Sequence, residues 1–148
     1  MPNPILWEAA PSSQGNVLST ELNSLANGSR TNGGQVIDNS VNLDKYGWFE
    51  LNVTFGSAPN ADGYVALYLV TALNGTNYAS GSSTVAPGAD AWVINIPVNA
   101  VNTAQNKQVG PVLLPPAKFK VIAENKTGQA FPASGSVIKL YTANDEIQ

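Results

Sequence analysis

The chain has 148 residues, with seven basic and ten acidic side chains, a formal net charge of -3, no histidine and no cysteine. This length suits a single domain, and the negative charge argues against general attraction to nucleic acid, which depends on clustered Lys and Arg. Disulfides and thiolate metal sites are excluded without cysteine, and the commonest general base and metal ligand is missing without histidine.

The first residues, MPNPILWEAAPSSQ, contain two early prolines and lack the basic segment and long apolar run of a secretory signal. No later segment approaches the ~18 uninterrupted apolar residues that a membrane-spanning helix needs. We therefore expect a soluble protein, made in the cytoplasm, with no membrane partner. Residues 1–17 are predicted to form an N-terminal arm.

One short helix is expected near the N-terminus, within SSQGNVLSTELNSLANGS. Ser19 is a suitable N-cap, Leu22 and Leu25 are three residues apart, and Gly28 stands where a left-handed C-cap would. The following GSRTNGG segment is rich in turn-forming residues and is predicted to be a loop. The run QVIDNSV, near Gln35, is expected to be a strand.

The central region alternates apolar and polar residues with a period of two, which is typical of strands. In YGWFELNVTF the residues Phe49, Leu51, Val53 and Phe55 share one face and Trp48, Glu50, Asn52 and Thr54 the other. In GYVALYLVTAL both faces are apolar, which indicates a central strand covered on both sides. A tight hairpin turn is expected at Asn74-Gly75.

The second half continues with AWVINIPV, QVGPVLL, KFKVIAEN and SVIKLYT. Pro97 should mark a strand end or an edge, because proline cannot donate to a ladder, and Gly110-Pro111 should interrupt the second of these runs. The inward-facing residues expected on these strands are Trp92, Ile94, Ile96, Phe119, Val121, Ala123, Ile138 and Leu140.

These patterns predict an all-β protein, an antiparallel β-sandwich of about seven or eight strands with one short N-terminal helix. Residues 18–143 are expected to form the single domain, and residues 144–148 a C-terminal tail.

No catalytic motif is found. The acids are spread singly through predicted turns and outward strand faces, except for the adjacent Asp145 and Glu146, so we predict that the protein is not an enzyme and has no cofactor and no catalytic or metal-binding residues. One alternative is a calcium site made by the loop oxygens of Asp38, Asn39, Asn42 and Asp44. That spacing matches no EF-hand, and such residues are common in turns.

The three tryptophans suggest either a sugar-binding surface or a protein interface. Trp92 is in phase with the inward residues, whereas Trp48 is out of phase with its apolar neighbours and Trp7 lies in the N-terminal arm. In the sugar-binding alternative, Trp48 and Tyr64 would be the stacking groups. In the protein-interface alternative, the terminal arms bind a neighbour by strand addition. The candidate interface residues are Ile5, Leu6, Trp7, Trp48, Tyr141 and Ile147.

Three segments, taken in order, carry a resemblance to a known family: LSTELNSLANGS with VIDNSVNLDKYGWFELNV, then GYVALYLVTALNGTNY, then VLLPPAKFKVIAENKTGQAFPASGSVIKLYTANDEI. Together they resemble small virion proteins of tailed bacteriophages, the head decoration or cement proteins with a jelly-roll-like β-sandwich. The resemblance extends from about Leu18 to Glu146.

The resemblance implies a structural protein on the capsid exterior of a virion, which binds the major capsid protein, bridges neighbouring capsid subunits and forms a homodimer or homotrimer. It brings no active site with it. A tail or neck adhesion protein of the same particles, or a carbohydrate-binding module, is the alternative function.

Overall fold

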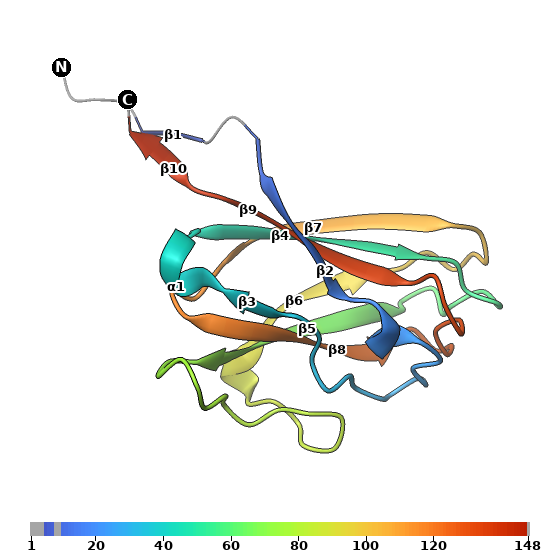
Figure 1. The fold of residues 1–148 in the computed structure, drawn as a ribbon. Helices are drawn as coiled ribbons and strands as arrows, with labels where there is room; N and C mark the ends of the chain where they lie inside the picture. The colour runs from blue at the N-terminus through green and yellow to red at the C-terminus, as the bar shows by residue number, and fades with distance from the viewer. Residues whose placement is uncertain (1–4, 8–9, 148) are drawn as a thin grey trace.

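The structure, a computed structural model, describes the backbone of residues 5–7 and 10–147 and the side chains of residues 10–145. In that part of the chain, two four-stranded antiparallel sheets pack face to face, and a two-stranded ribbon stands away from them (Figure 1). The strands are β1 (Ile5–Trp7), β2 (Ser12–Leu18), β3 (Val36–Asp38), β4 (Tyr46–Val53), β5 (Tyr64–Ala72), β6 (Trp92–Pro97), β7 (Gln105–Leu113), β8 (Lys118–Lys126), β9 (Val137–Ala143) and β10 (Asp145–Ile147).

The strand order is β2-β9-β4-β7 in one sheet and β3-β8-β5-β6 in the other, while β1 pairs with β10 to form the ribbon. This arrangement confirms the predicted all-β sandwich. The sandwich starts before the predicted boundary at residue 18, because β2 is a strand of the first sheet and pairs with β9. Val17 and Leu18 at its end are buried, which fixes this segment in the domain rather than in an arm.

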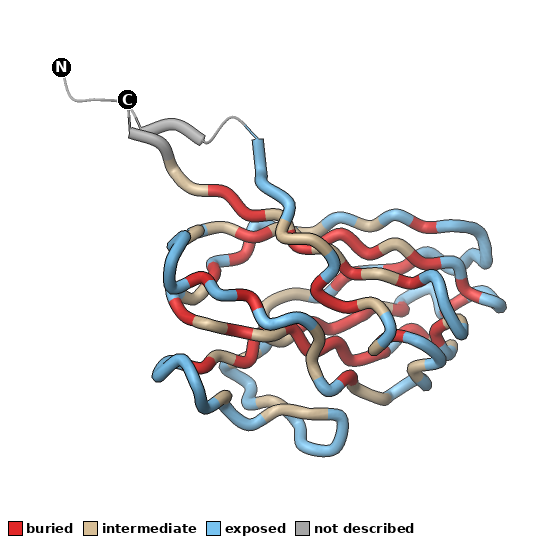
Figure 2. Tube along the Cα trace, viewed as in Figure 1, coloured by how far each residue is buried: buried red, intermediate tan, exposed pale blue. Residues whose placement is uncertain are grey.

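The core lies between the two sheets, and the alternation of the sequence fills it as predicted. Phe49 and Leu51 from β4 meet Leu67 from β5 and Phe119 from β8, and all four are fully buried. Figure 2 shows buried stretches running along both sheets and exposed residues gathered in the connecting loops. The prediction of which face of these strands points inward is confirmed.

Strand β5 is also covered on its outer face, as its two apolar faces predict. Val70 of β5 and Ile122 of β8 are fully buried but lie outside the main core cluster. The loop of residues 73–91 crosses them, and a Cβ added at Gly81 would lie 2.9 Å from Val70 and 3.1 Å from Ile122. This loop therefore acts as a third layer over the second sheet.

The predicted N-terminal helix is wrong in extent. Strand β2 ends just before Ser19, the predicted N-cap, and only Thr20–Leu22 forms a single 3₁₀ turn, η1. The side chain of Ser19 makes no capping hydrogen bond. The backbone bonds instead to a distant loop: the N–H of Ser24 donates to Pro132 O and that of Phe131 to Leu25 O. Leu22 and Leu25 are therefore three residues apart because a non-helical segment packs them against the domain, and not because they share one face of a helix.

The segment near Gln35 is part strand and part helix. Strand β3 is followed at once by α1 (Asn39–Asn42), one helical turn whose N-cap is Asp38. The carboxylate of Asp38 accepts a hydrogen bond from the Ser40 N–H, which satisfies an N–H that the short helix leaves unpaired. Leu43, in the left-handed conformation at φ 55°, ends the turn.

Trp92 does not point inward as predicted. Residue pairing shifts between Leu67↔Ile94 and Tyr68↔Trp92, so β6 carries one extra residue, Val93, at a β-bulge. Because side chains alternate with a period of two, this single insertion places Trp92 on the outer face, where its side chain is half exposed and its Nε1 donates to Asn95 Oδ1 over 3.0 Å.

The remaining loops follow the sequence signals in part. Asn74-Gly75 forms the expected turn, with Asn74 Oδ1 accepting from the N–H groups of Thr76 and Asn77, but residues 73–91 separate β5 from β6, so no tight hairpin joins them. Pro97 ends β6 as predicted. Strand β7 spans residues 110–111, but its pairing with β4 is shifted there, between Gly47↔Val112 and Phe49↔Val109, which agrees with the expected interruption. In the described residues no helix has the length and apolarity to cross a bilayer.

Candidate functional site

The outer face of the β2-β9-β4-β7 sheet carries an aromatic pair. Trp48 on β4 lies directly opposite Tyr141 on β9 in the antiparallel register. Both side chains point away from the core, because their neighbours Phe49 and Leu140 point into it, and both are half-buried. Two of the predicted interface residues, far apart in sequence, are therefore brought together on one surface.

These two rings form one wall of a surface groove of about 400 Å³. Among the described residues, Pro11, Phe49, Glu50 and Gln108 also line it. Pro11 precedes β2, so the groove spans the strands β9, β4 and β7 and lies where the chain leaves the sheet toward the ribbon. A groove that combines apolar rings with a carboxylate and an amide has the composition of a small-molecule site.

The position of the Trp48 ring is set by its neighbours. A Cβ added at Gly110 on β7 would lie 2.8 Å from Trp48 Cδ1 and 2.8 Å from the Gly47 carbonyl, so only glycine leaves room for the ring. Gly110 also has φ +141°, in a region that other residues rarely adopt. On the other side the Tyr46 ring lies 6.5 Å away, tilted by 53°.

Glu50 lies beside the aromatic pair and is almost completely enclosed by hydrogen-bond donors. Its Oε1 accepts from Asn52 Nδ2 over 2.8 Å and from Lys139 Nζ over 3.1 Å, and its Oε2 accepts from Gln108 Nε2 over 2.9 Å. The hydrogen bond from Asn52, followed by that from Lys139, lowers the pKa of Glu50 to about 2. The carboxylate is ionised and held in one orientation.

The same donors extend into a polar row across the sheet. Asn106 on β7 donates to Asn52 Oδ1 over 2.7 Å, so two amides and a carboxylate are linked from β7 to β4. The ion pair between Glu50 and Lys139 then joins this row to β9. The outer face of the sheet is thus divided into an aromatic half and a hydrogen-bonded polar half.

The ribbon is the second candidate site. β1 and β10 pair through Ile5↔Ile147, Leu6↔Glu146 and Trp7↔Asp145. Four predicted interface residues, Ile5, Leu6, Trp7 and Ile147, lie on these two strands, and their side chains are outside the described residues. In Figure 1 the ribbon projects from one end of the sandwich, so the two ends of the chain leave together.

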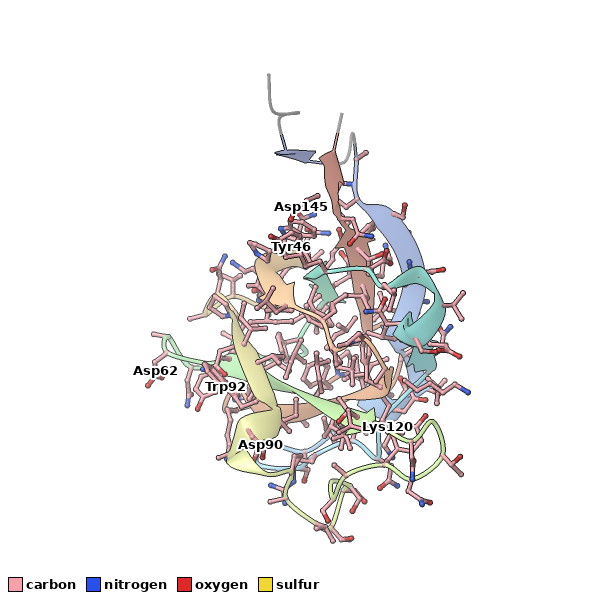
Figure 3. The ribbon with its side chains drawn as sticks, turned by 90° about the vertical axis from the view of Figure 1, so that its left-hand side faces the viewer. Tyr46, Asp62, Asp90, Trp92, Lys120 and Asp145 are labelled. Carbon is pink, nitrogen blue, oxygen red and sulfur yellow. The ribbon has the colours of Figure 1, made fainter. Side chains whose placement is uncertain are left out.

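The base of the ribbon is fixed by residues at the start of β4. Lys45 Nζ lies 2.6 Å from Asp145 Oδ2 and 4.9 Å from the centre of the Tyr46 ring. The hydrogen bond to Asp145 raises the pKa of Lys45 above its usual range. Asn144 Oδ1 accepts from the Lys45 N–H over 2.8 Å, at the residue between β9 and β10. Figure 3 looks onto this end, with Tyr46 beside Asp145.

Comparison with protein-family models, curated proteins and solved structures finds no match for this chain.

The second sheet does not complete the groove. Tyr64, the predicted stacking partner of Trp48, lies on β5 opposite Lys126 and Pro97, on the other side of the sandwich. Glu124, the other buried acid among the described residues, accepts from Tyr68 Oη over 2.9 Å and forms ion pairs with Arg30 and Lys126. Because Glu50 and Glu124 lie on the outer faces of different sheets, they do not form a carboxylate pair.

The loop considered for calcium uses its polar groups to hold the chain together. Asn39 Nδ2 donates to the carbonyls of Asp44 and Pro115, and Asn39 Oδ1 accepts from the Asp44 N–H. Asp38 caps α1 and Asp44 Oδ1 accepts from Asn144 Nδ2. In residues 10–145 no three acidic side chains are grouped so as to hold a metal ion.

Sequence reasoning missed Glu50 and Gln108 as parts of a site. The alternation correctly placed Glu50 on the same face as Trp48, but it suggested a solvated acid. Its enclosure depends on Lys139 and Gln108, which reach it only because β9 and β7 flank β4 in register. That pairing is not visible within any single strand.

Proposed function

We propose that the protein is a structural component of a tailed-phage virion, a capsid decoration protein that binds the major capsid protein and associates with copies of itself. The ribbon formed by β1 and β10 is the observation that carries this proposal. Within the described residues each of its strands pairs only with the other, so each has one edge with free backbone groups.

A two-stranded ribbon is only marginally stable by itself in water, and its open edges are templates for pairing with another chain. A ribbon that projects from the sandwich therefore gains stability when a neighbour adds a strand to it. Many such contacts on a repeating shell would multiply a weak individual affinity. The resemblance of the sequence to phage decoration proteins agrees with this mode of attachment.

The rest of the surface supports a binding role rather than catalysis. The two buried acids of the described residues are each neutralised by basic neighbours on separate faces of the sandwich. The groups that form ion pairs and hydrogen bonds along the outer faces stabilise the sheets. We therefore propose a protein that acts by contact and has no catalytic activity.

The test uses phage shells that lack this protein. A variant without residues 1–9 should keep the β-sheet circular dichroism of the full chain but lose most of its binding to the shells, as measured by co-sedimentation. Trp92→Ala, on the second sheet and away from the ribbon, is the matched control and should bind normally. Equal binding by the truncated variant, or labelled protein found only on tails, would contradict the proposal.

A further inference from the structure

We propose that Asn32-Gly33 is a site of spontaneous covalent modification, at which the side chain of Asn32 cyclises onto the backbone and converts to isoaspartate. The chain contains Asn-Gly steps at Asn27-Gly28, Asn32-Gly33 and Asn74-Gly75. Glycine has no Cβ, so its nitrogen is the least hindered nucleophile that can follow an asparagine. The sequence therefore offers three such steps, and the fold determines which of them reacts.

The reaction needs only water as a co-reactant. The Gly33 backbone nitrogen gives up its proton and attacks Cγ of Asn32. A new N–C bond forms, and the Cγ–Nδ2 bond breaks with release of ammonia, which carries the proton away. The product is a cyclic imide. Water then opens the ring: addition at the main-chain carbonyl gives isoaspartate, and addition at Cγ gives aspartate. Neither step oxidises or reduces any atom.

The carbonyl group that is attacked has the same kind of support at all three steps. A backbone N–H donates to its Oδ1 atom in each case: from Ser83 to Asn32 over 2.9 Å, from Gly128 to Asn27 over 2.8 Å, and from Thr76 to Asn74 over 3.0 Å. A donor at this oxygen stabilises the negative charge that develops there during the attack. The side-chain carbonyl therefore does not distinguish the three steps.

The attacking nitrogen does distinguish them. The Gly28 N–H donates to Asn125 O over 2.6 Å, and the Gly75 N–H donates to Ala72 O over 2.9 Å. Each of these hydrogen bonds has to break before the nitrogen can turn toward the preceding side chain. The Gly33 N–H makes no hydrogen bond within the described part of the chain. Its nitrogen is therefore the one that is free to react.

The fold also requires glycine at position 33. Gly33 has φ +89°, in a region that other residues rarely adopt, and an added Cβ would lie 2.8 Å from Cδ of Lys120. The preceding Asn32 is exposed, so water reaches the reacting groups. The unhindered nucleophile is thus a consequence of the backbone conformation at this point.

Conversion of Asn32 changes how the loop of residues 73–91 is held. The hydrogen bond from the Ser83 N–H to Asn32 Oδ1 ties this loop to the segment before β3. In isoaspartate the main chain runs through the former side-chain carbon, which moves the acceptor and lengthens the segment. The loop covers Val70 and Ile122, so we expect the modification to release Ser83 and loosen this cover. The reaction involves no residue of the ribbon and does not depend on the proposed attachment.

The experiment is an incubation of the purified full chain at mildly alkaline pH and body temperature, followed by tryptic digestion and mass spectrometry. Cleavage after Arg30, Lys45 and Lys107 places the three Asn-Gly steps in separate peptides, residues 1–30, 31–45 and 46–107. Peptide 31–45 should gain the mass of deamidation at least about fivefold faster than the other two. Fragment spectra should locate the change at Asn32, and isoaspartyl methyltransferase should accept the main product.

Asn32→Gln is the matched control, and its peptide 31–45 should stay unmodified because glutamine would have to form a larger ring. In concentrated urea the three wild-type peptides should react at similar rates, because the hydrogen bonds of Gly28 and Gly75 are lost. Equal rates in the folded protein, a change located at Asn39 or Asn42, or the same preference for peptide 31–45 in urea would each overturn the proposal.

Hydrogen–deuterium exchange of the incubated protein tests the effect on the loop. In the modified fraction the Ser83 amide should exchange several-fold faster than in fresh protein, because it has lost its acceptor. Amides of β4, on the other sheet, should exchange at the same rate in both samples. An unchanged rate at Ser83 would show that Asn32 does not hold the loop and would overturn this part of the proposal.

Discussion

Lys45 Nζ lies 2.6 Å from Asp145 Oδ2, and this ion pair joins the residue just before β4 to the first residue of β10. Tyr46 adds to it, since its hydroxyl lies 3.5 Å from the same carboxylate oxygen. The pair spans the point at which the chain leaves the sandwich for the ribbon. The direction of the ribbon therefore depends on side chains of the first sheet.

Replacing Lys45 should loosen the ribbon while leaving the sandwich folded. In Lys45→Met, backbone amides of β1 and β10 should exchange with deuterium several-fold faster, because the ribbon loses a tether and opens locally more often. The thermal unfolding midpoint should change little, since the ion pair is at the surface. Lys118→Met, which breaks the ion pair with Asp38 at another exposed site, should leave exchange in the ribbon unaltered.

Glu50 should make stability depend on pH below neutral. Its pKa falls from 4.5 to about 2 in the folded protein, so the native state favours the ionised form and Glu50 adds stability that is complete above about pH 4.5. This contribution is lost as the pH falls through about 2. Glu50→Gln should destabilise the protein at pH 7 by on the order of 2 kcal/mol, because the hydrogen bonds from Lys139 and Gln108 lose their charged acceptor.

The measurement is the difference in unfolding free energy between wild type and Glu50→Gln, from urea titrations between pH 7 and pH 2. That difference should shrink steadily below pH 4.5. Asp62→Asn, on an exposed loop, is the control and should follow the wild-type curve. A difference that stays constant down to pH 2 would show that Glu50 is not held ionised by the fold.

A charged side chain should prevent folding at the buried Leu67 but be tolerated at the exposed Leu73. Leu67 is fully buried between the sheets, and an unpaired carboxylate there costs several kcal/mol against a total stability of about 5–15 kcal/mol. Leu67→Asp should therefore prevent folding, seen as loss of dispersed amide resonances. Leu73→Asp, at a position that is 84 % exposed just after β5, should retain them. A folded Leu67→Asp protein would mean that the two sheets do not pack as described.

Gly110 should be needed for the geometry of the groove. In Gly110→Ala the added methyl group would meet both the Gly47 carbonyl and the Trp48 ring at 2.8 Å, at a backbone φ of +141° that alanine rarely adopts. We expect a loss of about 1–3 kcal/mol of stability and a changed near-ultraviolet circular dichroism spectrum as the indole moves. Gly56→Ala is the control, since its added methyl group meets no atom within 4 Å. An unchanged spectrum in Gly110→Ala would contradict this account of the Trp48 position.

The sequence predicted those parts of the fold that depend on local alternation. Phe49, Val121 and Leu140 point inward because each belongs to an uninterrupted period-two run, and burial of one face determines the other. The prediction failed at Trp92 because a β-bulge at Val93 shifts the alternation of the side chains. The bulge depends on the pairing with β5 and cannot be recognised from AWVINIPV itself. Leu22 and Leu25 were predicted to lie on a helix. Residues that are buried from a loop can have the same three-residue spacing as residues on one face of a helix.

Only individual residues of the groove could be predicted from the sequence, not their arrangement. Trp48 was recognised as out of phase with the core and Tyr141 as a candidate interface residue, but their pairing arises from the register between β4 and β9, which are separated in the chain by four other strands. The choice of Tyr64 as the partner of Trp48 failed for the same reason. Local patterns say which face a side chain occupies, whereas strand order decides what it meets there.

The pairing of Ile5 with Ile147 has a practical consequence for protein engineering. Because the first and last described strands run side by side, a few glycine and serine residues would suffice to connect them into a closed loop. New chain ends could then be opened in the exposed part of the 73–91 loop, on the far side of the second sheet. In such a circular permutant, cargo fused at the new ends would face away from the ribbon.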